Sequence, residues 1–181
     1  MLPIRHVIAL VSLTLATAFG SLAFAQSHAE LERNSRAALN NLIAQNQTAK
    51  DLNAKAVAVL VFPDVKKAGF IVGGQYGEGV LWRSGKAAAF YNTGGASVGL
   101  QAGAQQYGYA LFLMTEDAVK ALDAADGFEV GIGPSVVVVD QGYAKATTTT
   151  TIKDNIYAFI FSQKGLMAGV GIQGNKITKI K

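Results

Sequence analysis

Gly69-Phe-Ile-Val-Gly-Gly-Gln-Tyr-Gly-Glu-Gly79 is the stretch that decides the fold, because it puts five glycines among β-branched and aromatic residues. Of the 20 glycines in the chain, 19 fall between Gly69 and Gly174, and many interrupt apolar runs in the same way. Glycine weakens a regular strand, but it is tolerated where a strand bends, bulges or lies close to another backbone or a ligand. The pattern predicts a small, strongly curved β-structure.

Turn signals divide the rest of this region. The apolar run from Ala56 to Phe62 predicts a strand that Pro63-Asp64 ends. Gly77-Glu78-Gly79 is a hairpin signal, and Ser84-Gly85-Lys86 is a second turn. Residues 96–105 and 107–114 are expected to form another strand pair. Continued to the C-terminus, this division predicts about nine to ten strands.

Helical patterns occur in two places. Apolar side chains at helical spacing predict an amphipathic helix from Ala29 to Gln45, and Thr48 followed by Asp51 resembles the cap of a second, short helix. Thr115-Glu116-Asp117 should cap a helix inserted between strands. The predicted fold class is therefore β-rich α+β, a curved antiparallel sheet or barrel-like sandwich. Its N-terminal helices should lie on the sheet, or else face a membrane or a partner.

The first 25 residues have the features of a secretory signal peptide. Arg5 and His6 form a short basic region, an uncharged and mostly apolar run follows, and Ala23-Phe24-Ala25 provides a cleavage site of small residues before Gln26. Cleavage predicts a periplasmic or secreted protein. Its expected parts are a signal peptide at 1–25, a helical segment at 26–54 and a β-rich domain at 55–181.

The composition argues against several classes of function. The chain has no cysteine, and His28 is its only histidine after the predicted signal, so triad catalysis and a zinc site on Cys or His ligands are not expected. Without Arg5 the chain keeps 15 basic and 12 acidic side chains, which suits an anionic membrane surface but supplies no basic run for nucleic acid. We expect no cofactor, no metal and no enzymatic activity, with a carboxylate-only enzyme as the remaining catalytic alternative.

Several blocks of sequence together resemble the SYLF domain. The first are Lys55-Ala-Val-Ala-Val-Leu-Val-Phe-Pro63, Val65-Lys-Lys-Ala-Gly-Phe70 and Gly77-Glu-Gly-Val80. Ala96 to Gly103 and the closing Ser162-Gln-Lys-Gly-Leu-Met-Ala-Gly-Val-Gly-Ile-Gln-Gly174 are similar to its later blocks. The order and spacing of the blocks carry the resemblance, which runs from about Ala54 to Ile180.

This resemblance implies a lipid-binding module of the short, secreted bacterial type. Eukaryotic members of the family are associated with phosphoinositide membranes and with actin. The candidate lipid-binding residues are the basic side chains expected near turns: Lys66, Lys67, Arg83, Lys86 and Lys164. Of these, Lys67 and Lys164 stand where similar sequences carry a basic residue. The expected partner is an anionic phospholipid or membrane surface. The alternative is a protein partner bound by strand addition or through the N-terminal helix.

Overall fold

A computed structural model describes residues 28–123, 127–130, 136–139, 155–165, 172 and 174–180. The predicted signal peptide and the whole of the predicted strand at 144–152 lie outside these residues. A helix runs through residues 28–45, as predicted, and we refer to it as the N-terminal helix. The other elements are α2 (Gln47–Lys55), β1 (Ala58–Arg83), β2 (Lys86–Leu113), α3 (Glu116–Leu122), β3 (Phe128–Glu129), β4 (Val136–Val138), β5 (Ile156–Gly165) and β6 (Lys176–Lys179).

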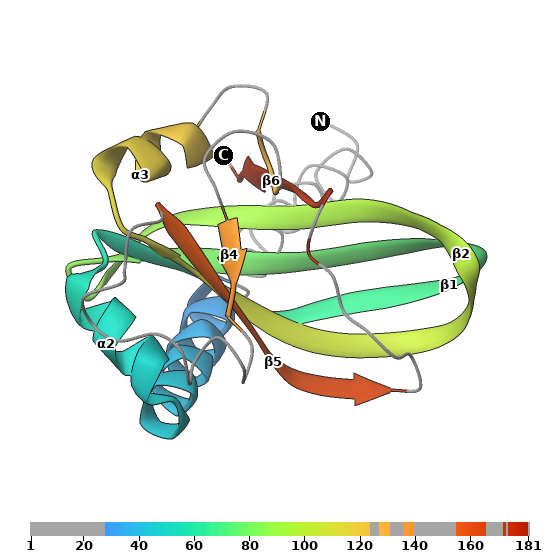
Figure 1. Cartoon of the computed structure of the whole chain (residues 1–181), viewed down its shortest axis with the longest axis horizontal. Coiled ribbons are helices and arrows are strands. Elements are labelled where there is room, and N and C mark those ends of the chain that lie inside the picture. The colour runs from blue at the N-terminus through green and yellow to red at the C-terminus, as the bar shows by residue number, and fades with distance from the viewer. Residues whose placement is uncertain are drawn as a thin grey trace, which may run out of the picture.

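One long hairpin, β1–β2, dominates the structure (Figure 1). Ser84 and Gly85 form its two-residue turn with φ of 49° and 76°, the left-handed pair that matches the twist of a tight hairpin. This confirms the turn predicted there. The hairpin predicted at Gly77-Glu78-Gly79 is wrong, because β1 runs straight through these residues and pairs them with Asn92 and its neighbours.

The predicted count of nine to ten strands is too high for the same reason. Residues 96–105 and 107–114, expected as a strand pair, belong mainly to the single strand β2. Within the described residues the sheet has six strands. Glycine in these runs marks places where a continuous strand bends, and the chain does not reverse there.

The sheet is curled into a half-barrel. Strand β2 pairs with β1 along most of its length, with β5 through residues 105–113 and with β6 through residues 91–94. All these pairs are antiparallel, but β4 pairs with β5 in parallel, so the sheet is mixed and not purely antiparallel as predicted. The β-rich α+β class is confirmed.

Two glycines allow β1 to curl over itself. A Cβ atom at Gly77 would lie 2.7 Å from the Asp64 carbonyl oxygen, and one at Gly79 would lie 2.6 Å from the Phe62 ring. Real Cβ atoms essentially never approach so closely. The expectation that strand glycines let another backbone come close is confirmed at these two positions.

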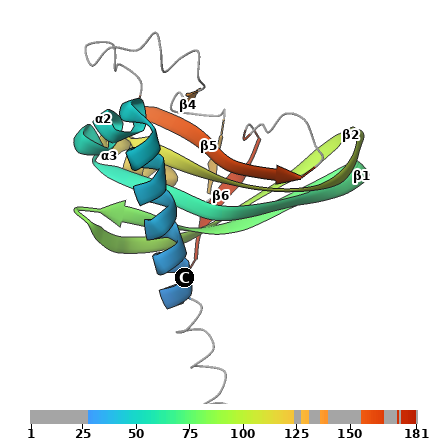
Figure 2. The same ribbon diagram turned by 90° about the horizontal axis from the view of Figure 1, so that it is seen from below.

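Side chains alternate between the two faces of the sheet. On β1, Val59 and Val61 pack with the N-terminal helix and α2 through Leu39 and Leu52, and we call this the outer face. Figure 2 shows the N-terminal helix lying against one side of the sheet. The opposite or inner face carries a second core cluster, in which side chains such as Leu60 and Phe62 pack with α3.

The N-terminal helix is fixed to the outer face by a buried polar chain. The Trp82 indole N–H donates to Ser35 Oγ at 2.9 Å, and the Ser35 hydroxyl donates to the Val61 carbonyl at 3.3 Å. The apolar side chains Leu31, Ala38, Leu42 and Ile43 pack against the outer-face core. The expectation that the N-terminal helices lie on the sheet is confirmed, because the apolar stripe of the helix is used in packing.

The helix caps agree with prediction at one site and differ at another. Thr115 Oγ1 accepts from the Ala118 N–H and caps α3, as predicted. Thr48 is not the cap of α2, because it lies within the helix, and Asn46 Oδ1 accepts from the Ala49 N–H instead. Asparagine is among the strongest N-cap residues, so the helix begins at Gln47.

Candidate functional site

Lys66, Gln106 and Lys164 form one row across three strands of the outer face. Lys66 on β1 is directly opposite Gln106 on β2, and Gln106 is directly opposite Lys164 on β5. All three side chains are exposed. Two strand spacings, roughly 10 Å, separate the backbones of the two lysines, so the polar amide of Gln106 lies between their charges.

A cleft of about 450 Å³ adjoins this row. Residues 66–68 of β1, 104–106 of β2 and Lys164 of β5 line it. Ala68 and Ala104 are paired across the strands next to the lysine row, and their small side chains leave the cleft floor apolar. Lysine side chains have apolar stems and charged tips, so this cleft combines an apolar floor with a cationic rim.

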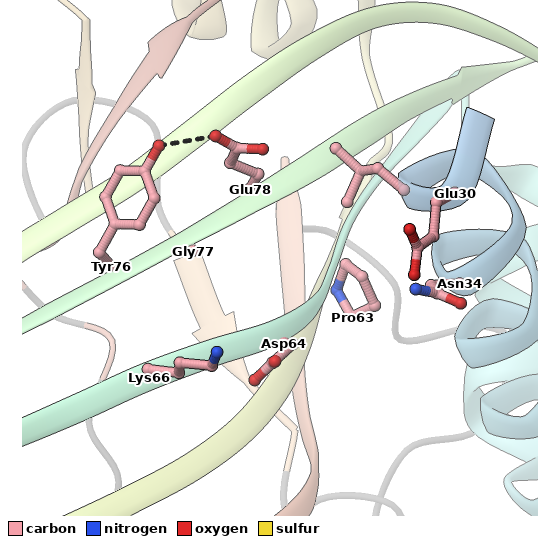
Figure 3. A pocket seen from close by; sticks show the side chains of 9 residues that line it. Glu30, Asn34, Pro63, Asp64, Lys66, Tyr76, Gly77 and Glu78 are labelled. Carbon is pink, nitrogen blue, oxygen red and sulfur yellow. Dashed lines mark hydrogen bonds between the residues drawn. The ribbon is translucent and has the colours of Figure 1, made fainter. Parts of the chain in front are cut away.

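Lys66 also lines a second pocket, of about 310 Å³, between the N-terminal helix and β1 (Figure 3). Its other charged residues are acidic: Glu30, Asp64 and Glu78. Tyr76 is 55% exposed here, and its hydroxyl donates to Glu78 Oε1 at 2.8 Å. Partial burial and this bond to Glu78 raise the pKa of Tyr76. Lys66 therefore lies between an acidic pocket and the cationic cleft.

Lys67 points the other way. Lys66 and Lys67 were predicted to flank a tight turn, but both lie inside β1, where neighbouring side chains project to opposite faces. The Lys67 side chain is 8% exposed and lies on the inner face, opposite Gln105. Lys164, also predicted in a turn, is part of β5.

Arg83 and Lys86 are at the β1–β2 turn, separate from the lysine row. Arg83 forms an ion pair with Glu116 of α3. Lys86 lines a pocket of about 690 Å³ that also contains Arg33 and Arg36 of the N-terminal helix. The predicted basic set is thus divided between the hairpin turn and the cleft. Lys66, Lys67 and Lys164 all line the cleft, although the mostly buried Lys67 projects to the inner face of β1.

Sequence reasoning missed two features of these surfaces. Arg36 stacks on Trp82, with its guanidinium carbon 3.8 Å from the ring centroid, and donates to the Gly85 carbonyl. The three-residue spacing of Arg33 and Arg36 could have predicted that both lie on one face of the helix. Gln106 carried no such signal, because its role depends on the register of three strands.

Metal and membrane-spanning features are not found in the described part of the chain. Its side chains include no group of three or more His, Cys, Asp or Glu residues arranged to hold a metal ion. No helix among the described residues has both the length and the apolar character needed to cross a bilayer.

The family comparison agrees with the resemblance inferred from the sequence blocks. Residues 94–181 match the Ysc84 family model, described as Las17-binding protein actin regulator. The earlier blocks, from Lys55 to Val80, precede the matched range. No curated protein matches the chain. The Ysc84 domain is the SYLF domain, and this chain belongs to the SYLF-domain family.

Proposed function

We propose that this protein is a non-catalytic binder of anionic lipid or of an anionic membrane surface in the bacterial envelope. The observation that carries the proposal is the row Lys66–Gln106–Lys164 beside the alanine-floored cleft. Two exposed ammonium groups at the edge of an apolar depression match a lipid, whose phosphate is anionic and whose chains are apolar. Family membership supports the general kind of function.

Each lysine is expected to contribute only modestly to the free energy of lipid binding. A lysine near an anionic surface contributes about 1 kcal/mol, so reversing two lysines should weaken binding by more than tenfold, which corresponds to about 1.4 kcal/mol. The attraction should decrease with salt, since the screening length is about 10 Å at 0.1 M and about 3 Å at 1 M. Contact with the apolar floor of the cleft should add to the binding free energy, and salt does not weaken that contribution.

The proposed location rests on the predicted signal peptide. Cleavage after Ala25 would release the mature chain into the periplasm or the medium, where it would meet envelope lipids. Mass spectrometry of the exported protein tests this step, and a chain that retained residues 1–25 would contradict it.

A protein partner is the second candidate function. The matched family is described by its binding to Las17 and its regulation of actin, which favours protein recognition in at least some members. Among the described strands, β1 pairs only with β2, so its other edge is the candidate for strand addition. The N-terminal helix is a weaker candidate, because its apolar residues pack on the sheet.

Vesicle co-sedimentation tests the lipid proposal. The purified protein should follow vesicles of phosphatidylglycerol in phosphatidylcholine, and the double variant Lys66→Glu, Lys164→Glu should bind at least tenfold more weakly. The matched control is Lys50→Glu, Lys176→Glu, which changes the net charge equally at two exposed lysines outside the cleft. Binding by the control should decrease by less than threefold.

Two outcomes would contradict the proposal. Equal losses in both double variants would show a general charge effect with no role for the cleft. No binding of the wild-type chain to anionic vesicles at low salt would remove lipid binding altogether and favour the protein partner.

A further inference from the structure

The pocket of about 690 Å³ beside the β1–β2 turn, which we call the turn pocket, has an excess of positive charge. Arg33 and Arg36 of the N-terminal helix and Lys86 of β2 contribute three cations to its described lining, against the one carboxylate of Glu32. None of these three cations forms an ion pair with a described residue. The volume of the pocket is in the range of about 300–1,000 Å³ that is typical of ligand sites.

The wall of the turn pocket is held in place by contacts within the chain. The Arg36 guanidinium lies over the Trp82 ring and donates to the Gly85 carbonyl. Trp82 is fixed in turn, because its indole N–H donates to the buried Ser35 hydroxyl. Arg36 is partly exposed and keeps one face on Trp82, so an aromatic ring that enters the pocket can stack on the opposite face of the guanidinium.

An exposed tyrosine and glutamate on β1 have the chemistry that complements this pocket. Tyr76 is 55% exposed, the largest exposed fraction of any large apolar side chain in the described part of the protein. Its hydroxyl donates to Glu78 Oε1 at 2.8 Å, so the ring and the carboxylate are presented together (Figure 3). Glu78 is exposed and forms no ion pair with a described residue. Exposed tyrosines of this kind are enriched in protein interfaces.

The Tyr76–Glu78 pair cannot enter the turn pocket of its own chain. Tyr76 and Trp82 belong to the same continuous strand, β1, and are six residues apart. At roughly 3.3 Å per residue this separation is about 20 Å, which a tyrosine side chain does not span. Any contact between the pair and the pocket is therefore a contact between two molecules.

We propose that the turn pocket binds the Tyr76–Glu78 pair of a second copy of this chain. The Tyr76 ring of one copy stacks on Arg36 of the other, which then lies between two aromatic rings. The Glu78 carboxylate pairs with Arg33 and Lys86, and these charge-assisted hydrogen bonds replace water on both sides. Complementary charge and aromatic character on the same chain identify the occupant. The contact is made twice if the copies close around a two-fold axis, and it repeats from copy to copy if they join head to tail.

Sedimentation velocity over a range of protein concentrations tests the proposal. Wild type should self-associate as a dimer or a longer assembly, and added salt should weaken the association. Two charge-reversed proteins, Glu78→Arg and the double variant Arg33→Glu, Lys86→Glu, should each associate at least tenfold more weakly. Tyr76→Ala, which removes the ring without changing the charge, should also weaken association, and circular dichroism checks that every variant is folded.

The matched control is Lys50→Glu, Lys176→Glu. It changes the net charge by the same amount as the double variant, at two exposed lysines outside the turn pocket. Its self-association should differ from that of wild type by less than twofold.

A mixture of the two charge-reversed proteins isolates the contact from any general effect of charge. In the mixture, the unchanged pocket of Glu78→Arg meets the unchanged Glu78 of the double variant. The arginine introduced at position 78 also meets the two glutamates introduced in the other pocket. The equimolar mixture should therefore associate about as tightly as wild type, although each component alone does not.

Three results would overturn the proposal. The first is a wild-type chain that stays monomeric at every concentration, and the second is a mixture in which the two charge-reversed proteins remain apart. The third is an equal loss of association in the control, because general charge repulsion would then explain the result. These variants leave Lys66 and Lys164 unchanged, so failure of self-association is distinct from failure of vesicle binding.

Discussion

Gly79 packs directly against the ring of Phe62, although both belong to the same strand, β1. A Cβ atom at Gly79 would lie 2.6 Å from Phe62 Cδ1 and 2.7 Å from the Val61 carbonyl oxygen. The contact exists because β1 curls back over itself, and it explains why the strand requires glycine at this point.

Gly79→Ala should therefore destabilise the protein. The added methyl group meets a backbone oxygen that has little freedom to move, and overpacking of this kind costs about 1–3 kcal/mol. Urea unfolding measures the change in the free energy of unfolding.

Gly74→Ala is the matched control on the same strand. The nearest atom to a Cβ at Gly74 is the Gly95 carbonyl oxygen at 4.0 Å, so the methyl group fits. This variant should be neutral or stabilising by up to about 1 kcal/mol, because alanine restricts the unfolded chain. Equal effects of the two substitutions would show that the curl does not depend on Gly79.

The curvature of the sheet could be predicted from the sequence, but its strand count could not. The glycine-rich run from Gly69 to Gly79 indicates bends, and the structure has them. Whether a Gly-x-Gly segment bends a strand or reverses it depends on what packs against it, and at Gly77 and Gly79 that is a segment of β1 near Phe62. Such contacts between distant parts of the chain are not encoded in local turn signals.

Only part of the candidate site could be predicted from the sequence, and the reason is related. Lys66 and Lys164 were recognised as basic residues, but only strand register brings them into one row through Gln106. The buried position of Lys67 was not predicted, because Pro63-Asp64 suggested a turn. In the structure the register merely shifts between Phe62 and Val65, and the strand continues. A bulge of this kind keeps the alternation of faces beyond it, which separates Lys67 from Lys66.

Ser35→Ala should loosen the N-terminal helix from the sheet. The substitution leaves the Trp82 indole N–H without its acceptor and the Val61 carbonyl without its side-chain donor. An unsatisfied buried donor costs about 1–3 kcal/mol, and the loss should appear as a lower midpoint in urea unfolding. Asn40→Ala, at an exposed position of the same helix, is the control and should change stability by less than about 0.5 kcal/mol. A Ser35→Ala midpoint equal to that of wild type would mean that apolar packing alone holds the helix.

Asn46→Ala should weaken α2, whereas Thr48→Ala should not. Asn46 Oδ1 accepts from the Ala49 N–H at 2.9 Å, and loss of an N-cap costs about 1 kcal/mol, within a range of about 0.5–2 kcal/mol. Thr48 lies within the helix, where alanine has the higher intrinsic helix propensity. Thermal unfolding of the two variants in parallel is the measurement. If Thr48→Ala lowered the thermal midpoint more than Asn46→Ala, Thr48 would be the cap of α2 after all.

The buried tyrosines should make the protein less stable at alkaline pH. Tyr109 is fully buried, its hydroxyl donates to Thr93 Oγ1 at 2.7 Å, and burial raises its pKa well above the usual value for tyrosine. Burial also raises the pKa of Tyr107. Below pH 10 these side chains are protonated in both the folded and the unfolded chain, so their contribution to stability is fully present. Above pH 10 the unfolded chain releases the protons and the folded chain keeps them, so the free energy of unfolding falls by up to about 1.4 kcal/mol per pH unit for each such tyrosine.

Tyr109→Phe isolates this effect, because it removes one titrating group from the inner face. The variant should start from a lower stability at pH 8, since Thr93 loses its hydrogen-bond donor. Between pH 10 and pH 11 its free energy of unfolding should nevertheless fall by about 1 kcal/mol less than that of wild type, as measured by urea unfolding across the range. The slope carries the prediction, because a lost hydrogen bond lowers the whole curve without tilting it. Parallel curves for wild type and variant would show that Tyr109 ionises as readily in the folded protein as in the unfolded chain.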